Sequence, residues 1–180
     1  MDKYEILLKQ NQKTFHADDL ALLWDIDNKS TLNMTLKRFV DRGILKRIHK
    51  GFYATCDISN IDSLDIGFSY LNTYSYVSLE TILVREGIIF QNINYITFVS
   101  SKSSVFCINT KMYRSRQLKD QFLNNSLGIV KIDNHFEATM ERAIADMLYF
   151  NPKYYFDNKD SINIDQVKFI QKEVGYVISQ

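Results

Sequence analysis

The sequence predicts an α+β protein built from two domains. Amphipathic helix patterns dominate the first 42 residues and are followed at once by a short hairpin pattern. Strand patterns and helix patterns then mix over the rest of the chain. A polar, turn-rich and acidic stretch at residues 57–62 lies between these two parts. These observations place an N-terminal domain at residues 1–56 and a mixed α/β domain at residues 62–180.

Three helices are expected in the N-terminal domain. Apolar residues at positions i, i+3 and i+4 predict a first helix at about residues 3–10. A second is expected at 17–24, with Thr14 as its N-cap or opening the turn before it. Asn28 or Ser30 can cap the third. On a helical wheel the third helix has a buried stripe made of Leu32, Leu36, Phe39 and Val40.

A β-hairpin is expected directly after the third helix. Gly43 suits the left-handed residue that ends a helix. Residues 44–48 and 52–54 alternate apolar and polar side chains, and the three residues 49–51 between them include a glycine. The residues expected on the core side are Ile44 and Ile48, with Phe52 or Tyr53 opposite. Helix, helix, turn, helix and hairpin is the order of a winged helix-turn-helix, which we therefore predict for residues 1–56.

The positive charge of the chain is concentrated on this third helix and hairpin. Between Lys29 and Lys50 there are seven Lys or Arg residues and one acid, Asp41, which is a net charge of +6. The whole chain of 180 residues carries only +1, so the rest is acidic on balance. A solvated surface helix would mix both signs, whereas a phosphate backbone attracts one. The charge pattern predicts double-stranded DNA as a partner.

The expected DNA-binding residues divide by their place on the third helix and hairpin. In helix-turn-helix docking the N-terminal part of the recognition helix reaches base edges. The face of the third helix opposite the buried stripe carries Ser30, Thr31, Asn33, Met34, Lys37 and Arg38. The residues placed for phosphates are Arg42, Lys46, Arg47 and Lys50, with His49 beside them at the hairpin tip. Simpler roles stay open for some of them. Asn33 can be ordinary polar surface, Arg42 can complement the helix C-terminus, and His49 with Lys50 can be solvated turn residues.

The second domain has the pattern of a mixed α/β fold whose topology the sequence does not give. Helices are expected at 63–71, at 79–86 with Ser78 as cap and Gly87 as its end, from the cap Thr139 to 150, and at 165–174 with Gly175 after it. Strands are expected at 95–99, 105–108 and 128–132.

No catalytic or metal site is predicted. The chain lacks the glycine-rich nucleotide motifs and the hydrolase motif G-x-S-x-G, and its three histidines have no partner at metal-ligand spacing. Cys56 and Cys107 are isolated, so neither disulfides nor metal-binding pairs are expected. The acids Glu137, Glu141 and Asp146 were the one group that could hold a divalent ion, but Glu141 and Asp146 lie five apart on a helix and do not share a face. No cofactor is expected.

The sequence also predicts a cytoplasmic location. The start MDKYEILLKQ lacks the order of a signal peptide. No apolar run approaches the roughly 18 residues of a membrane span, so no membrane partner is expected.

Four segments together resemble a known family. They are TFHADDLA from residue 14, LKRFVDRGILKRIHKGFYA from 36, YVSLETILVREGII from 76 and EATMERAIADMLY from 137. In this order they resemble the AbiEi-type antitoxins of type IV toxin–antitoxin (abortive-infection) systems. By position, the basic helix and wing of that family match Lys37, Arg38, Arg42, Arg47 and Lys50, and its ERA…D helix, taken as structural, matches Glu141, Arg142, Ala143 and Asp146. Met140 departs from the family, whose members often have a proline there.

The resemblance implies a DNA-binding antitoxin that is not an enzyme. It would repress its own operon by binding promoter repeats, and its second domain would counteract a nucleotidyltransferase-like toxin encoded next to it. Two other readings remain. One is a stand-alone winged-helix regulator whose second domain senses a ligand or dimerises. The other is a nuclease or another enzyme that uses the acids of the second domain.

Overall fold

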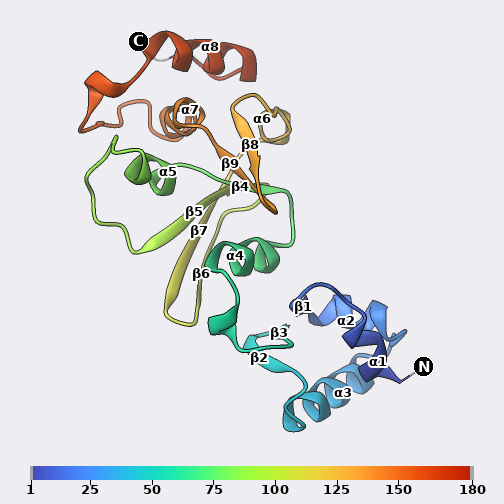
Figure 1. Ribbon diagram of the computed structural model, residues 1–180. Coiled ribbons are helices and arrows are strands. Elements are labelled where there is room, and N and C mark those ends of the chain that lie inside the picture. Colours follow the sequence, from blue (N-terminus) through green and yellow to red (C-terminus); the bar gives the residue numbers. More distant parts are fainter. Residues whose placement is uncertain (1, 179–180) are drawn as a thin grey trace. The chain divides into compact units, whose positions relative to one another are not determined.

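The computed structural model describes residues 2–178 and has an α+β fold. The described part contains eight α-helices and two β-sheets, divided between two compact units, one ending at Asn72 and one beginning at Thr73 (Figure 1). The sequence placed the division at residues 57–62. The structure instead groups the next helix, α4 (Ser63–Leu71), with the first unit.

The first unit combines helices with a three-stranded antiparallel sheet. Its elements are α1 (Lys3–Leu8), β1 (Thr14–His16), α2 (Ala17–Leu23), α3 (Lys29–Asp41), β2 (Lys46–His49), β3 (Phe52–Ala54), a 3₁₀ turn at Ile58–Asn60, and α4. The strand order is β1-β3-β2, so β3 lies in the middle. Residues 14 to 16 pair with 54 to 52, which joins the start of the chain to the hairpin.

Local sequence explains the ends of α3. The Asn28 side chain accepts a hydrogen bond from the Thr31 N–H at 3.0 Å, so Asn28 is the N-cap. Gly43 follows the helix with a φ of +69°, as predicted. The hairpin turn consists of Lys50 and Gly51, one residue shorter than predicted, because β2 includes His49.

Two predictions about the first unit were wrong. Thr14 is neither a cap nor part of a turn but opens β1; α2 is preceded by His16, whose N–H donates to Asp19 Oδ2 at 2.9 Å. The core residue before β2 is Leu45, which was not predicted, and Ile48 is half-buried outside the core. Ile44, also half-buried, packs against the core as predicted. The core consists of Leu7, Phe15, Leu20, Trp24, Leu32, Leu36, Phe39, Leu45 and Tyr53, and Val40 packs at its edge.

The second unit is built on a six-stranded mixed sheet of order β6-β7-β5-β4-β9-β8. Its strands are β4 (Ser75–Val77), β5 (Tyr95–Ser100), β6 (Ser104–Ile108), β7 (Lys111–Gln117), β8 (Ile129–Ile132) and β9 (His135–Ala138). Its helices are α5 (Glu80–Arg85), α6 (Asp120–Leu123), α7 (Met140–Phe150) and α8 (Ile164–Val174), with a 3₁₀ turn at Lys159–Ser161. Thr139 caps α7, as predicted, through its acceptance from the Arg142 N–H.

Two residues of α7 form a buried ion pair. Arg142 and Asp146 are both fully buried, and Arg142 Nε donates to Asp146 Oδ1 at 2.9 Å. The other nitrogens of Arg142 donate to the carbonyls of Asn125 (3.1 Å), Leu127 (2.8 Å) and Phe122 (3.2 Å).

Asp146 also accepts from the hydroxyls of Tyr76 (3.0 Å), Ser78 (2.8 Å) and Tyr176 (2.7 Å). Ser78 therefore serves this network, and α5 is preceded by Leu79 rather than capped by Ser78.

The network changes the acidity of its members. Burial, and then the negative charge of Asp146, raise the pKa values of Tyr76 and Tyr176 well above the ordinary tyrosine range. Burial acts to lower the pKa of Arg142, but Asp146 and the two tyrosines outweigh it and raise that pKa. The tyrosines therefore stay neutral and the arginine stays charged at all ordinary pH values.

Candidate nucleic-acid interface

The exposed face of α3 is polar and cationic. Leu32, Leu36 and Phe39 are buried, so the helix is fixed to the core along one side. The predicted DNA-binding residues of the helix all lie on the exposed side: Ser30, Thr31, Asn33, Met34, Lys37 and Arg38. Met34 is 55% exposed and so presents an apolar side chain on this face.

A groove runs between α3 and the β2–β3 hairpin. It has a volume of about 530 Å³ and is lined by Ala17, Lys29, Asn33, Leu36, Lys37, Val40, Arg47, Lys50, Gly51 and Tyr53. Four of these residues are cations, two from the helix and two from the hairpin, and none is an acid. We call this the basic groove. It brings together four of the predicted site residues, Asn33, Lys37, Arg47 and Lys50.

The chain positions both walls of the basic groove through short-range contacts. Leu36 and Tyr53 are buried in the core and line the groove as well, so they set the spacing between helix and hairpin. The Ala17 N–H donates to the Gly51 carbonyl at 2.8 Å, which fastens the hairpin turn to the start of α2. The φ of Gly51 is +71°, a conformation that suits glycine and lets the turn be this tight.

Lys29 was not among the predicted site residues, although it lines the basic groove. It was counted only in the charge of the region. Lys29, Asn33 and Lys37 are spaced by four residues, so they form one stripe along α3. That spacing is the signal in the sequence that would have identified it.

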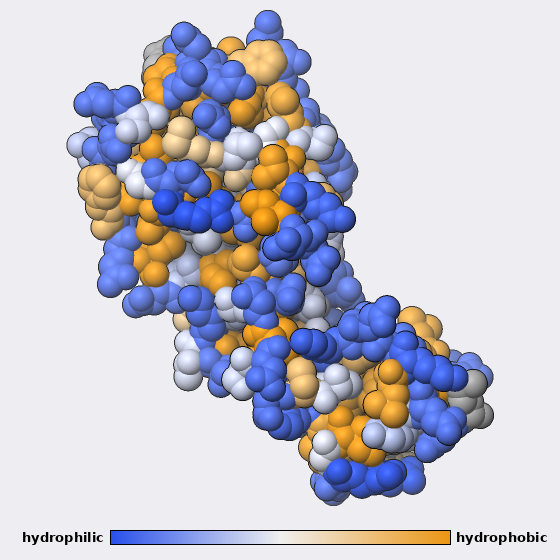
Figure 2. Space-filling view, viewed as in Figure 1, coloured by the Kyte–Doolittle hydropathy of each residue, from blue (hydrophilic) through white to orange (hydrophobic). Residues whose placement is uncertain are grey.

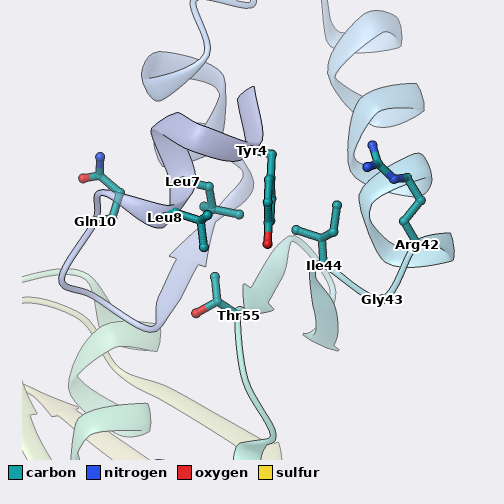
Figure 3. Close-up of a pocket in the computed structure, with 8 residues that line it drawn as sticks. All are labelled: Tyr4, Leu7, Leu8, Gln10, Arg42, Gly43, Ile44 and Thr55. Carbon is teal, nitrogen blue, oxygen red and sulfur yellow. The ribbon is translucent and has the colours of Figure 1, made fainter. Parts of the chain in front are cut away.

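Arg42 lies apart from the basic groove. It lines a different cavity, of about 420 Å³, with Tyr4, Leu7, Leu8, Gln10, Gly43, Ile44 and Thr55. Figure 3 shows Arg42 at the end of α3, with the α1 side chains Tyr4 and Leu7 on the other side of Ile44. The structure does not bring Arg42 together with Lys37, Arg47 and Lys50.

Two further predicted residues have partners within the protein. Lys46 is ion-paired with Asp57, and both side chains are exposed. His49 is half-buried: its Nδ1 lies 3.3 Å from the Tyr70 hydroxyl, and the two rings pack edge to face with centroids 5.0 Å apart. His49 therefore anchors the hairpin to α4, and the charge of Lys46 is already partly balanced.

The three acids considered for a divalent ion lie in separate environments. Asp146 is held in the buried network, and Glu137 is buried and paired with Arg85 Nη1 at 2.6 Å. Glu141 is half-buried in the first turn of α7. Among residues 2–178 no group of three or more His, Cys, Asp or Glu side chains could hold a metal ion.

Comparison with known proteins identifies no relative. No protein-family model matches the chain, and no curated protein is significantly similar to it. Over the described residues, no helix combines the length and apolar character needed to cross a membrane. The face of the molecule in Figure 2 is largely hydrophilic, with hydrophobic areas between.

Proposed function

We propose that the first unit is a winged helix-turn-helix that binds double-stranded DNA. The basic groove carries the proposal, because four cations from two separate elements line one surface and no acid does. A DNA duplex presents rows of phosphates on both sides of its major groove, and cations on a helix and on a hairpin suit that spacing. In this proposal α3 enters the major groove and the β2–β3 hairpin is the wing.

The residues have different roles in this binding. Asn33, Met34, Lys37 and Arg38 are exposed on α3 and would meet base edges. Asn suits adenine, Lys and Arg suit guanine, and a Met side chain can contact a thymine methyl group. Arg47 and Lys50 on the hairpin, together with Lys29, would contact phosphates and set the register.

The resemblance to AbiEi-type antitoxins supplies the biological setting of the proposal. The chain would repress its own operon through promoter repeats, and its second unit would counteract a nucleotidyltransferase-like toxin encoded beside it. The alternative, a stand-alone regulator without a toxin, shares the DNA-binding step. Arg142 and Asp146 make their hydrogen bonds inside the protein, which supports a structural role for the ERA…D helix whether or not there is a toxin partner.

The DNA-binding step is tested by titrating the protein against its own promoter fragment in a gel-shift assay. Lys37→Ala combined with Arg38→Ala is expected to weaken binding by several kcal/mol, since each bidentate base contact contributes roughly 1–3 kcal/mol. A matched control removes two lysines of the same unit that do not line the basic groove, Lys9→Ala with Lys13→Ala. Equal affinity of the two double variants would refute the assignment of α3.

The antitoxin step needs a separate experiment. The product of the adjacent gene is expressed alone and together with this chain, and growth is measured. We expect growth arrest by the neighbour and rescue by co-expression. A harmless neighbour, combined with normal promoter binding, would favour the stand-alone regulator and leave the DNA-binding proposal intact.

A further inference from the structure

The second unit contains a polar cluster that is separate from the Arg142–Asp146 network. It forms where Glu80, the first residue of α5, meets strands β5 and β7. Thr81 and Thr97 fix this meeting point: the Thr81 N–H donates to Thr97 Oγ1 at 3.1 Å, and the Thr97 N–H donates to Thr81 Oγ1 at 2.7 Å. Thr97 is in turn the register partner of Arg114 on β7. Glu80 is thus held beside a strand that carries arginine.

Glu80 is a buried carboxylate that is only partly satisfied. Its side chain belongs to a residue that is 8% exposed, and the Tyr95 hydroxyl hydrogen-bonds to it. The second oxygen, Oε2, is buried without a hydrogen-bond partner among the described residues, and so is the hydroxyl of Tyr154. A carboxylate oxygen removed from water normally has a donor, because its desolvation is costly. Such an orphaned acceptor is a place where a ligand can bring the missing donor.

Two arginines of β7 lie near Tyr95, and Arg116 interacts with Glu80 as well; aromatic rings hold both arginines. The guanidinium of Arg114 lies 4.6 Å from the centre of the Tyr95 ring, and that of Arg116 lies 4.0 Å from the centre of the Phe150 ring. Stacking occupies the flat face of a guanidinium and leaves its N–H edges free for a carboxylate or a phosphate. Within residues 2–178 neither arginine forms an ion pair, whereas Arg85 and Arg142 both do.

The charge of the cluster favours an anion. Two arginines face one buried acid; the nearby Asp157 is exposed and accepts the Phe90 N–H at 2.7 Å. Burial, together with the charge of Arg114, lowers the pKa of Arg116, although Glu80 opposes the shift. An added oxyanion would relieve the repulsion between the two cations.

We propose that Glu80, Tyr95, Arg114, Arg116 and Tyr154 form a binding site for a small ligand that carries both an oxyanion and an N–H donor. The oxyanion would bind the N–H edges of Arg114 and Arg116, and the donor would bind Glu80 Oε2. Two kinds of metabolite have this chemistry: amino acids, with a carboxylate and an ammonium group, and nucleoside monophosphates, with a phosphate and a base N–H group. The site is independent of the DNA-binding proposal.

The test measures thermal unfolding of the full chain with each of the twenty amino acids and four common ribonucleoside monophosphates at millimolar concentration. A ligand that binds only the folded state raises Tm, and isothermal titration then gives its Kd. We expect stabilisation by members of one of the two groups, which identifies the source of the oxyanion.

Glu80→Gln and Arg114→Gln should each weaken binding about tenfold or more, since each removes one charge-assisted hydrogen bond. Lys111→Gln, at an exposed position on the same strand but outside the cluster, should bind as the wild type does.

The variants also separate this site from a purely structural role for Glu80. Glutamine keeps an acceptor for Tyr95, so the free Glu80→Gln protein should melt no lower than the wild type. A lowered Tm of the free variant with no ligand response in the wild type would overturn the proposal. So would ligand binding that both Glu80→Gln and Arg114→Gln retain. Should Glu80→Gln fail to fold, the exposed Arg114→Gln decides the outcome on its own.

Discussion

The two units place their charged side chains in opposite environments. In the first, Lys29, Lys37, Arg47 and Lys50 line an open groove, and no ion pair within residues 2–178 involves them. In the second, Arg142 is fully buried and donates to Asp146 and to three backbone carbonyls. A solvated cation costs the fold little and stays available to a partner, whereas a buried one must have all its hydrogen bonds made inside the protein. Availability to a partner, rather than number, therefore distinguishes binding charges from structural ones.

Removing the buried cation should have the largest effect on stability. Arg142→Met leaves Asp146 as an uncompensated buried charge, and breaking a buried pair from one side costs about 3–5 kcal/mol. Urea unfolding should show this loss. The double variant Arg142→Met with Asp146→Leu removes both charges and should recover part of the stability. A loss below about 1 kcal/mol in the single variant would mean that water reaches the pair in solution.

A second comparison uses two glycines of similar conformation, one in each unit. Gly128 has a φ of +72°, and a Cβ added there would lie 2.8 Å from Arg142 Cβ and 3.3 Å from Thr139 Oγ1. Gly43 has a φ of +69° and no atom within 4 Å of such a Cβ. Gly43→Ala should therefore cost only the backbone strain, about 1–2 kcal/mol. Gly128→Ala adds overpacking and should cost about 1–3 kcal/mol more. Denaturant midpoints measure both, and equal losses would contradict the close packing around Arg142.

The tyrosines of the buried network predict a loss of stability in alkali. Tyr76 and Tyr176 have raised pKa values in the folded state, so their contribution is complete below about pH 10, where unfolded tyrosine stays protonated. Above that pH the unfolded chain ionises and the folded chain does not, and each tyrosine lowers the unfolding free energy by about 1.4 kcal/mol per pH unit. Tyr176→Phe should halve the combined slope of the pair between pH 10 and 12. An unchanged slope would show that Tyr176 ionises in the folded state.

The smallest effects are expected from single lysines of the hairpin region. Lys50 lines the basic groove, so Lys50→Ala should reduce the slope of log K against log salt for DNA binding by about 1. Lys46 is ion-paired with Asp57, so Lys46→Ala should change the slope much less. Anisotropy titrations at salt concentrations from about 50 to about 200 mM measure the two slopes, because DNA affinity changes strongly over that interval. Identical slopes for the two variants would remove the distinction between free and paired cations.

Sequence reasoning succeeded where the signal is local. Asn28, Gly43 and Thr139 mark helix ends through their own hydrogen-bonding or conformational preferences, and the structure has helix ends at all three. The helix at Ser63–Leu71 was also predicted at its observed bounds. The sequence did not predict that α4 belongs to the first unit, because this depends on the packing of α4 against β1 rather than on the residues of α4 alone.

The missed elements depend on partners that are distant in the sequence. β1 has three residues, too few to show alternation, and exists because it pairs with β3. β7, with the sequence KMYRSRQ, is polar at most positions but lies between β5 and β6. The separation of Arg42, Lys46 and His49 from the basic groove has the same cause, since Tyr4, Asp57 and Tyr70 are their neighbours only after folding.

The position of β3 in the middle of the first sheet also orders events during synthesis. Thr14–His16 leaves the ribosome long before its partner Phe52–Ala54, so β1 must wait unpaired while 35 intervening residues emerge. The hairpin turn is then joined to α2 by the bond from Ala17 to Gly51. The hairpin wall of the basic groove is therefore completed after the α3 wall has emerged. A nascent chain that stalls before residue 54 would carry the cations but not the groove.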